Sequence, residues 1–261
     1  MKIVTWNINS IKVRIQQLYD FLAEDKPDIV LLQEIKCETD KFPYDELSDL
    51  NYNFYVHGQK SWNGVAILSK YRADEVTYDF PGNYYSNESR FIEIALQTPI
   101  GFCRIISLYA PNGGEVDSDK FVGKLKFYDS LTAYLKSKKQ WDAKLFIGGD
   151  FNIAPFDIDV YSPKDLLNTT CFTLRERQKL RTIMNLGFYD LYRIAHPDKQ
   201  EFSWFDYKGG ALQRNKGMRI DGVLASSNGA NNLVDSFMLY SMRTVTKPSD
   251  HVPVVTILKN D

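Results

Sequence analysis

The chain has 261 residues, of which 44% are hydrophobic and 25% charged, and this composition is typical of an ordinary globular protein with a substantial core. The net charge of −1 excludes the overall basicity of a dedicated nucleic-acid binder, so contact with phosphates must come from a local patch or a bound metal. The three cysteines lack CxxC spacing, which argues against a disulfide framework or zinc site and favours a reducing compartment.

The first part of the chain predicts a β-α-β unit. Residues 2–6 alternate as a strand does, and Ser10 is placed to cap a helix whose apolar residues from Ile11 to Leu22 share one face. The unbroken apolar run at 28–34 is typical of a strand that is covered on both sides. No segment has the pattern of a signal peptide or a membrane span, so we expect a cytosolic protein, associated with the nucleoid if it is bacterial.

Closely spaced strands and further helices follow. We expect strands at 52–57, 64–69, 74–80, 91–97, 102–109, 144–149, 202–205, 219–225, 233–240 and 252–258. A long helix is expected at about 119–138, and the capping box from Thr173 to Glu176 predicts another, which closes near Gly187. No linker or repeat interrupts the pattern, so we expect one domain over residues 1–261, of the α/β (α+β) class, with two packed sheets and helices outside.

The stretch 145–152 combines a predicted buried strand with two polar side chains. Asp150 and Asn152 are two residues apart and project to the same side of an extended backbone, and Gly148 and Gly149 leave room for an approaching group. A carboxylate and an amide at a strand end are suited to hold a water or a metal against a phosphate. A turn rich in Asp and Asn after a buried strand is the alternative interpretation.

Other polar side chains stand where an apolar strand pattern stops or is interrupted. They are Asn7, Glu34, Tyr109, Asp221, Asp250 and His251. Taken one at a time, most of these residues have a plainer explanation, as turn residues, a core aromatic, a solvated carboxylate or a surface imidazole. Asp221 is the hardest to explain in this way, because an unpaired carboxylate inside a strand is costly. A buried pair with His251 would satisfy it and raise the basicity of the imidazole.

Taken together, these segments resemble the exonuclease III family of abasic-site endonucleases, within the endonuclease/exonuclease/phosphatase superfamily. The motifs are Asn7-Ile8-Asn9, 32–36, 148–152, 202–207, 219–221 and 247–253, in family order from one end of the chain to the other. The assignment to the DNA-repair branch depends on 202–207, on 57–60 and 63–66, and on the whole of 247–253.

The resemblance implies a four-layer α/β sandwich with the deoxyribonuclease I fold that hydrolyses phosphodiesters with Mg²⁺ or Mn²⁺. It implies Glu34 as the principal metal ligand, helped by Asn7 and Asp250, and oxygen ligands of this kind suit such hard ions. The expected substrate is duplex DNA with abasic sites or blocked 3′ ends, and the expected activities are incision 5′ to abasic sites, 3′→5′ exonuclease and 3′-phosphatase. The resemblance also implies a monomer.

Five side chains receive catalytic roles from the same resemblance. Asp150, steadied by Asn152, would position and deprotonate the attacking water. His251, held by Asp221, would donate to a phosphate oxygen, and Tyr109 would contact the same phosphate. Whether Asp150 or the His251–Asp221 pair is the base is left open by the sequence.

A basic and aromatic segment is the candidate for DNA contact. Its predicted contact residues are Trp204, Lys208, Arg214, Lys216, Met218 and Arg219. A solvated basic loop beside core aromatics is the plainer alternative. In the resemblance, this loop helps to form the pocket for a flipped-out abasic sugar.

Parts of the chain depart from the family pattern, and two other functions compete with DNA repair. Asn9 stands where some relatives carry Asp, and segments 111–118 and 155–172 differ from the expected pattern, which leaves the balance of the three activities open. A small-molecule or lipid phosphoesterase of the same superfamily would share the core residues without an aromatic DNA-facing loop. A catalytically inactive DNA-binding module would have lost a core residue, and all of them are present here.

Overall fold

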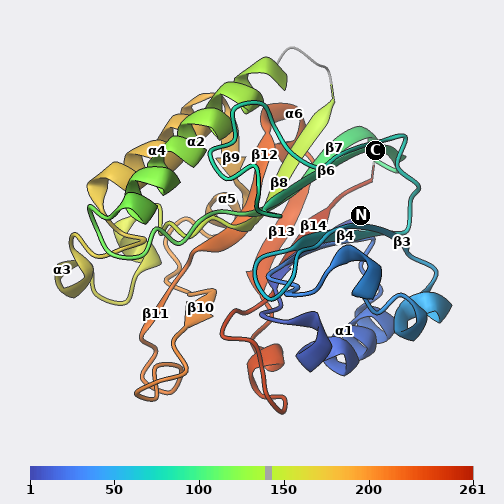
Figure 1. Ribbon diagram of the computed structural model, residues 1–261, viewed down its shortest axis with the longest axis horizontal. Coiled ribbons are helices and arrows are strands. Elements are labelled where there is room, and N and C mark those ends of the chain that lie inside the picture. The colour runs from blue at the N-terminus through green and yellow to red at the C-terminus, as the bar shows by residue number, and fades with distance from the viewer. Residues whose placement is uncertain (139–142, 261) are drawn as a thin grey trace.

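Two six-stranded sheets pack against each other at the centre of the molecule (Figure 1). The structure is a computed structural model, and it describes residues 1–138 and 143–260. In the first sheet the strand order is β13-β14-β1-β2-β4-β3, and in the second it is β5-β6-β7-β8-β12-β9. The pairs β1–β2 and β7–β8 are parallel and the other pairs are antiparallel, so both sheets are mixed.

The strands of the first sheet are β1 (Lys2–Asn7), β2 (Ile29–Gln33), β3 (Asn53–His57), β4 (Val65–Ser69), β13 (Leu233–Met238) and β14 (Val254–Leu258). Those of the second are β5 (Glu75–Thr77), β6 (Phe91–Thr98), β7 (Gly101–Tyr109), β8 (Lys144–Asp150), β9 (Phe188–Asp190) and β12 (Asp221–Ser226). A short ribbon is formed by β10 (Trp204–Phe205) and β11 (Gly217–Met218).

The helices are α1 (Ile11–Asp25), α2 (Asp119–Lys138), α3 (Pro163–Leu166), α4 (Leu174–Asn185), α5 (Leu191–Ala195) and α6 (Ser227–Ala230). Short 3-10 turns occupy Thr39–Lys41, Asp45–Leu50, Asp157–Asp159 and Tyr240–Arg243. Among the described residues, no helix combines the length and apolar character that crossing a bilayer requires.

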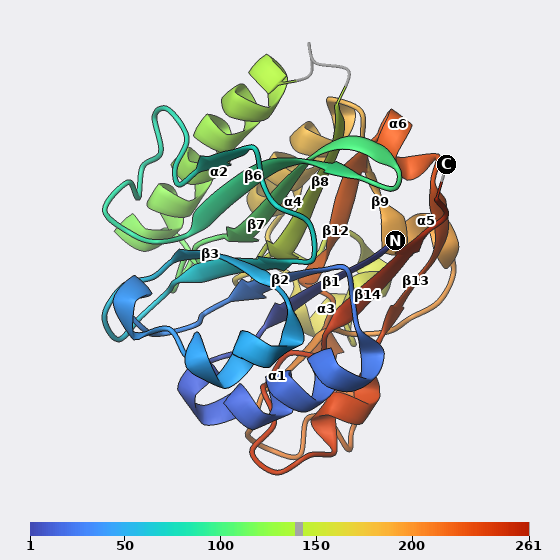
Figure 2. The same cartoon turned by 90° about the vertical axis from the view of Figure 1, so that its right-hand side faces the viewer.

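Three apolar clusters hold these elements in four layers. One fills the space between the two sheets, with Ile3 and Leu31 of the first sheet packed in the same cluster as Ile105 and Phe146 of the second. A second cluster joins the first sheet to α1, and a third joins the second sheet to α2 and α4. Figure 2 shows α1 on one side of the paired sheets and α2 with α4 on the other. The predicted four-layer α/β sandwich is therefore confirmed.

The helix prediction at Ser10 is correct in position but wrong in mechanism. Ser10 has a φ of 86° and its side chain makes no capping hydrogen bond. Instead, the backbone N–H groups of Ser10 and Ile11 donate to the carbonyls of Glu34 and Ile35, which follow β2. The start of α1 is thus satisfied by the neighbouring loop rather than by a cap. The capping box of Thr173 and Glu176 at the start of α4 is confirmed.

Several predicted strands are shorter than their apolar patterns. The segment 74–80 forms a strand only at Glu75–Thr77, and 202–205 only at Trp204–Phe205. The segment 219–225 begins its strand at Asp221, because Arg219 and Ile220 precede the sheet. Asp221 is therefore the first residue of β12 rather than an interior one.

Strand register brings the polar strand ends to one edge of the sandwich. Asn7 pairs with Gln33 at the end of the parallel β1–β2 pair, so Glu34 follows directly beside it. In the second sheet Asp150 lies between Tyr109 of β7 and Asp221 of β12. Since the two sheets pack face to face, these ends meet across the sandwich.

Gly149 lies at a point of close contact between strands, and Gly149→Ala tests how tightly it is packed. A Cβ atom at this residue would lie 2.0 Å from the backbone oxygen of Leu108. We expect the substitution to reduce the free energy of unfolding by roughly 1–3 kcal/mol, because the backbone of β7 would have to shift. Urea unfolding measures the change.

The matched control is Gly222→Ala, because Gly222 faces Gly149 in register on β12. A Cβ atom there would meet only the Nη1 atom of Arg219, at 3.7 Å, which is an ordinary contact. Equal unfolding midpoints for the two variants would contradict the steric argument.

Candidate active site

Most of the predicted catalytic and metal-binding residues line one cavity of about 420 Å³ at the common edge of the two sheets, and Asn7 and Asp221 lie outside its lining. Its walls comprise Glu34, Tyr109, Asn112, Asp150, Asn152, Thr170, Cys171, Trp204, Met218, Ile220, Asp250 and His251. Asn7 is fully buried beside this cavity, where its amide donates to the carboxylates of Glu34 and Asp150. Residues from both ends of the chain therefore complete a single site.

Asp150 is held from two directions. Its Oδ1 accepts a hydrogen bond from the backbone N–H of Asn152 at 2.9 Å, and its Oδ2 accepts one from Nδ2 of Asn7 at 3.0 Å. Asn152 has a φ of 49°, in the left-handed region that Asn tolerates better than most residues. Its side-chain amide donates to the carbonyl of Ala110. Asp150 and Asn152 both line the cavity, and the backbone N–H of Asn152 adds a direct contact to Asp150.

Glu34 shares the side-chain amide of Asn7 with Asp150. Its Oε1 accepts from Nδ2 of Asn7 at 2.8 Å, and its Oε2 is 2.9 Å from the ammonium of Lys36. Burial opposes ionisation of Glu34, but Lys36 and the hydrogen bond from Asn7 outweigh it and lower the pKa of the carboxyl. Glu34 is therefore charged at neutral pH.

His251 and Asp221 form the buried pair that the sequence predicts. Nδ1 of His251 lies 2.8 Å from Oδ2 of Asp221, and the same oxygen accepts a hydrogen bond from the Ser203 hydroxyl at 2.6 Å. The other ring nitrogen, Nε2, lies 3.8 Å from Oδ2 of Asp150. The imidazole is thus fixed on one side by Asp221 and presents its other nitrogen beside Asp150.

The electrostatics of this cluster favour a protonated imidazole. Burial opposes the charge on His251, but the carboxylates of Asp221 and Asp150 outweigh it and raise its pKa to about 10. Burial, and then the charge of Asp221, raise the pKa of Asp150 to about 7, against the attraction of His251. The protonated His251 therefore lies between the carboxylates of Asp221 and Asp150. Of these two, Asp150 takes up a proton more readily than an ordinary Asp.

We expect the His251 imidazole of the metal-free protein to titrate with a midpoint near 10, and Asp221→Asn to move that midpoint down. The Cε1–H resonance of His251 measures it, and His251→Gln assigns the peak. Because the folded-state pKa is raised from 6.5, the associated stabilisation is complete below that value and is lost as the pH rises through about 10. A midpoint near 6.5 in the wild-type protein would contradict the pairing.

The donor set fits a hard divalent cation. Ligand atoms of Glu34, Asp150 and His251 all lie within 4.8 Å of one another. The carboxylates of Glu34 and Asp150 offer oxygen ligands of the kind that Mg²⁺ and Mn²⁺ prefer. Asn7 turns its Nδ2 toward both carboxylates, and its Oδ1 accepts from the backbone N–H of Asn9, so its role as a ligand stays a prediction. Asp250 also lines the cavity, but its carboxylate accepts from Nδ2 of Asn9 and Nε1 of Trp204 and is not part of the closest group. Its role as a ligand stays a prediction.

Tyr109 lies at the end of β7 in the wall of the cavity. Burial, and then the nearby charges of Glu34 and Asp150, raise the pKa of its hydroxyl well above 10. The guanidinium carbon of Arg90 lies 4.8 Å from the centre of the ring. The phenol is therefore neutral and a hydrogen-bond donor at physiological pH.

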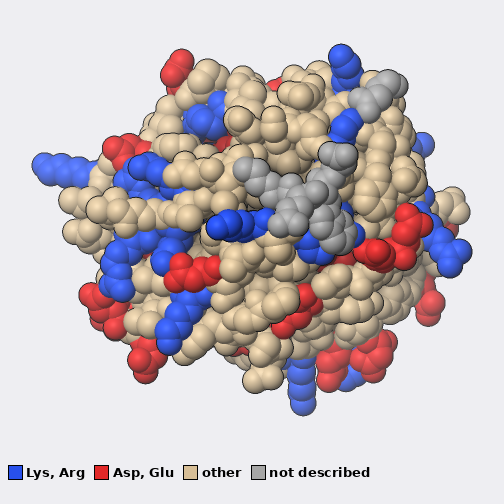
Figure 3. All heavy atoms as spheres, turned by 90° about the horizontal axis from the view of Figure 1, so that it is seen from above, with Lys and Arg blue, Asp and Glu red and all other residues tan. Residues whose placement is uncertain are grey.

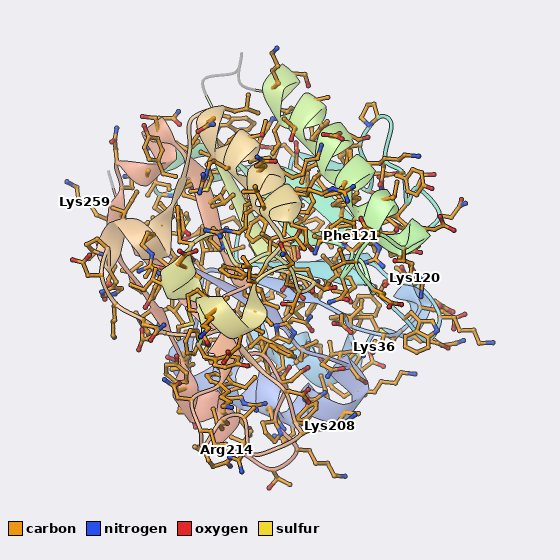
Figure 4. All side chains as sticks on the ribbon, turned by 90° about the vertical axis from the view of Figure 1, so that its left-hand side faces the viewer. Lys36, Lys120, Phe121, Lys208, Arg214 and Lys259 are labelled. Carbon is orange, nitrogen blue, oxygen red and sulfur yellow. The ribbon has the colours of Figure 1, made fainter. Side chains whose placement is uncertain are left out.

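The predicted DNA-contact residues divide into three groups. Trp204 and Met218 of the β10–β11 ribbon line the cavity. Lys208, Arg214 and Lys216 are exposed and lie in the loop between β10 and β11. Figure 4 shows Lys208 and Arg214 in the lower part of the view. The prediction for Arg219 is wrong.

Arg219 is 3% exposed and is paired with two buried carboxylates. Its guanidinium donates to Asp159 at 2.6 and 2.9 Å and to Asp190 at 2.7 Å. Arg193 binds the same Oδ1 atom of Asp159 that accepts from Nε of Arg219. The sequence pattern indicated only a cation near aromatic residues. Asp190 and Asp159 lie 29 and 60 residues away along the chain, so the local pattern could not predict these pairings.

Four supporting residues were missed as site residues. Ser203 binds Asp221, Asn112 donates to Oδ1 of Asn152 at 3.1 Å, and Asn9 connects Lys36 with Asp250. Ser203, Asn9 and Lys36 lie inside the motifs that carried the resemblance, so their proximity in sequence to the site was a usable signal. Asn112 lies in a loop that departs from the family pattern and gave no such signal.

Comparisons with known proteins agree with this geometry. Residues 4–251 match the Endonuclease/Exonuclease/phosphatase family. The chain is 34% identical to exodeoxyribonuclease III of Haemophilus influenzae over 262 residues, which cover 97% of this chain and 98% of that protein.

Solved structures give the same result. A 3′ phosphatase from Neisseria bound to a product DNA hairpin superposes with a TM-score of 0.95 at 36% identity, and 99% of each chain is covered. An AP endonuclease from Archaeoglobus fulgidus superposes with a TM-score of 0.94 at 35% identity, again over 99% of each chain.

Proposed function

The chain belongs to the exodeoxyribonuclease III branch of the endonuclease/exonuclease/phosphatase family, and on this premise we propose that it is a DNA-repair phosphodiesterase. It would incise duplex DNA 5′ to abasic sites and would clear 3′ ends as a 3′→5′ exonuclease and 3′-phosphatase. One observation carries the proposal: Glu34, Asp150 and the Asp221-bound His251 converge within one cavity that Trp204 and Met218 also line.

The buried carboxylate of Asp150 suits the role of general base. Burial and Asp221 bring its pKa to about 7, so it accepts a proton from water more readily than an ordinary Asp does. The N–H of Asn152 fixes one carboxylate oxygen, which leaves the orientation of the group defined.

The imidazolium of His251 suits the role of a hydrogen-bond donor to a phosphate oxygen. Its Nε2 lies on the cavity side, and Asp221 with Ser203 prevents the ring from turning. A donor placed in advance at developing negative charge stabilises the transition state without reorganisation. The neutral hydroxyl of Tyr109 would contribute a second donor from β7.

Mg²⁺ or Mn²⁺ held by Glu34, with Asn7 and Asp250 as further proposed ligands, would neutralise charge on the phosphate and on the leaving 3′ oxygen. The protein's own residues keep this site ready, because Lys36 and Asn7 hold Glu34 in its ionised form. Lys36 is bonded to Asn9, and Asn9 in turn to Asp250, so the proposed ligands share one hydrogen-bonded network.

DNA contact would depend on local positive charge. On the face seen from above, Lys and Arg are interspersed with Asp and Glu (Figure 3), as the net charge of −1 would lead one to expect. On the face in Figure 4, Lys36, Lys120, Lys208 and Arg214 lie in an arc. Lys120, Lys208 and Arg214 would meet the DNA backbone, and Trp204 and Met218 would offer flat and apolar groups to an exposed sugar, while Lys36 stays paired with Glu34.

The test is incubation of the purified protein with a labelled duplex that carries one abasic-site analogue, with Mg²⁺ or with EDTA. Metal-dependent incision immediately 5′ of the lesion is the expected result. Parallel duplexes with a 3′-phosphate end and an undamaged 3′ end rank the three activities.

Different products lead to different conclusions. Phosphate release from the 3′-phosphate end without incision would make end cleaning the main role. Equal turnover in EDTA would contradict the metal requirement. Inactivity on every DNA together with metal-dependent hydrolysis of a small phosphodiester would overturn the DNA-repair proposal.

A further inference from the structure

Beneath the wall of the cavity lies an ion pair that the reaction as described does not use. Lys124 of α2 and Glu176 of α4 have fully buried side chains, and Nζ of Lys124 lies 2.5 Å from Oε1 of Glu176. Neither residue lines the cavity. A buried charged pair contributes little net stability compared with apolar side chains of similar volume, so its presence calls for another explanation.

The ammonium of Lys124 uses all three of its donors. Besides Glu176, it donates to the backbone oxygen of Asn152 at 2.6 Å and to that of Asn112 at 3.0 Å. The side-chain amides of Asn112 and Asn152 are bonded to each other at 3.1 Å. One ammonium therefore holds the backbones of two residues whose side chains meet in the cavity wall.

Glu176 extends the connection to a third segment. Its Oε1 also accepts from the backbone N–H of Cys171, and its Oε2 accepts from the N–H and the hydroxyl of Thr173. The contact with Thr173 belongs to the capping box of α4, but a capping box requires neither the bond to Cys171 nor a buried lysine. The Lys124–Glu176 pair thus joins the loops after β7 and β8 to the segment before α4.

The effect reaches Asp150 through the backbone of Asn152. Asn152 has a φ of 49°, and in this conformation its N–H points at Oδ1 of Asp150 while its carbonyl points at Lys124. One turn further along α2, the hydroxyl of Tyr128 donates to the carbonyl of Phe151. Two successive carbonyls after Asp150 are therefore bound by side chains on one face of α2.

We propose that Lys124 and Glu176 are positioning residues for the hydrolysis: they fix the peptide of Asn152, and through it the orientation of the Asp150 carboxylate. The inference rests on the proposed function. The pair acts on the reacting groups only through this backbone, so its removal lowers kcat and leaves KM nearly unchanged.

The decisive variant is Lys124→Met combined with Glu176→Gln. Each single substitution leaves one buried charge without its partner and is expected to lower the melting temperature by about 10 °C. The double variant removes both charges and recovers most of that loss. Its kcat is nevertheless expected to stay about 10- to 100-fold below wild type, because the carbonyls of Asn112 and Asn152 remain without their donor.

Arg104→Met with Glu93→Gln is the matched control. This ion pair is also buried, with a distance of 2.7 Å between Nη1 and Oε1, and it joins β7 to β6. Glu75 also binds Arg104, while Tyr134 and Lys138 also bind Glu93, and these three residues lie outside the lining of the cavity. The control variant is expected to keep the wild-type kcat at temperatures where it is folded. A Lys124→Met/Glu176→Gln variant that regains wild-type kcat together with its stability would show that the pair serves folding alone.

A second readout separates this inference from the proposed function. The amide resonance of Asn152 reports its hydrogen bond to Asp150 without any substrate. We expect it to move in the Lys124→Met/Glu176→Gln variant and to stay in place in the control. An unmoved resonance would overturn the positioning role, whereas a wild-type protein inactive on every DNA would overturn only the proposed function.

Discussion

Asp150→Asn is expected to reduce kcat on a duplex with an abasic-site analogue by roughly 10⁴-fold, the upper end of what a general base contributes. Asn has nearly the same shape, and its Oδ1 still accepts from the N–H of Asn152, but it takes up no proton at neutral pH. DNA affinity is expected to stay near wild type, because Asp150 is 1% exposed and lies inside the cavity rather than on the cationic face. Single-turnover kinetics and fluorescence anisotropy measure the two quantities.

The control for this substitution is Asp129→Asn, which removes an exposed carboxylate that pairs with Lys179 on the outer helices. It is expected to leave both kcat and affinity unchanged. Turnover at the wild-type rate in Asp150→Asn would refute its role as the base. A loss of DNA binding equal to the loss of turnover would instead assign Asp150 to substrate binding.

His251→Gln is expected to reduce kcat by roughly 10²- to 10³-fold, which corresponds to the removal of one preorganised donor to developing negative charge. Gln retains a hydrogen-bond donor but carries no positive charge. The loss of kcat therefore measures the contribution of the imidazolium charge rather than that of the hydrogen bond alone. Asp221→Asn is expected to follow in the same direction, because the pKa of His251 is raised chiefly by Asp221.

The pH dependence of these variants distinguishes the two candidate bases. If Asp150 is the base, the rate rises as the pH passes the pKa of Asp150, and this rising limb persists in His251→Gln. Conversely, a rising limb that disappears in His251→Gln and persists in Asp150→Asn would make the histidine pair the base. Rate profiles from pH 5 to pH 10 cover the pKa of about 7 for Asp150 and the pKa of about 10 for His251.

The sequence predicted most of the site because its residues stand at strand ends. Side-chain alternation and apolar runs locate those ends, and residues at the ends of neighbouring strands meet by register. Asp221 was conspicuous for a physical reason, since a carboxylate beside apolar residues needs a partner, and His251 is that partner.

The failures also have physical causes. Arg219 was assigned to DNA because its neighbours in sequence are aromatic and basic, whereas its position is determined by Asp159 and Asp190, which are remote in sequence. Ser10 was assigned as a cap from its residue type. In the structure, the carbonyls of Glu34 and Ile35 accept the hydrogen bonds of the backbone N–H groups at the start of α1. Contacts between segments distant in sequence determine the position of Arg219 and the start of α1, and a local sequence pattern does not predict such contacts.

The strand order of the first sheet has a consequence for synthesis on the ribosome. β14 lies between β1 and β13, so the strand that follows His251 enters the sheet beside the one that ends in Asn7. A nascent chain therefore holds Asn7, Glu34 and Asp150 long before the imidazole that belongs beside them. The growing polypeptide therefore lacks a complete hydrolytic centre until His251 and the following β14 have been translated and β14 has paired with β1.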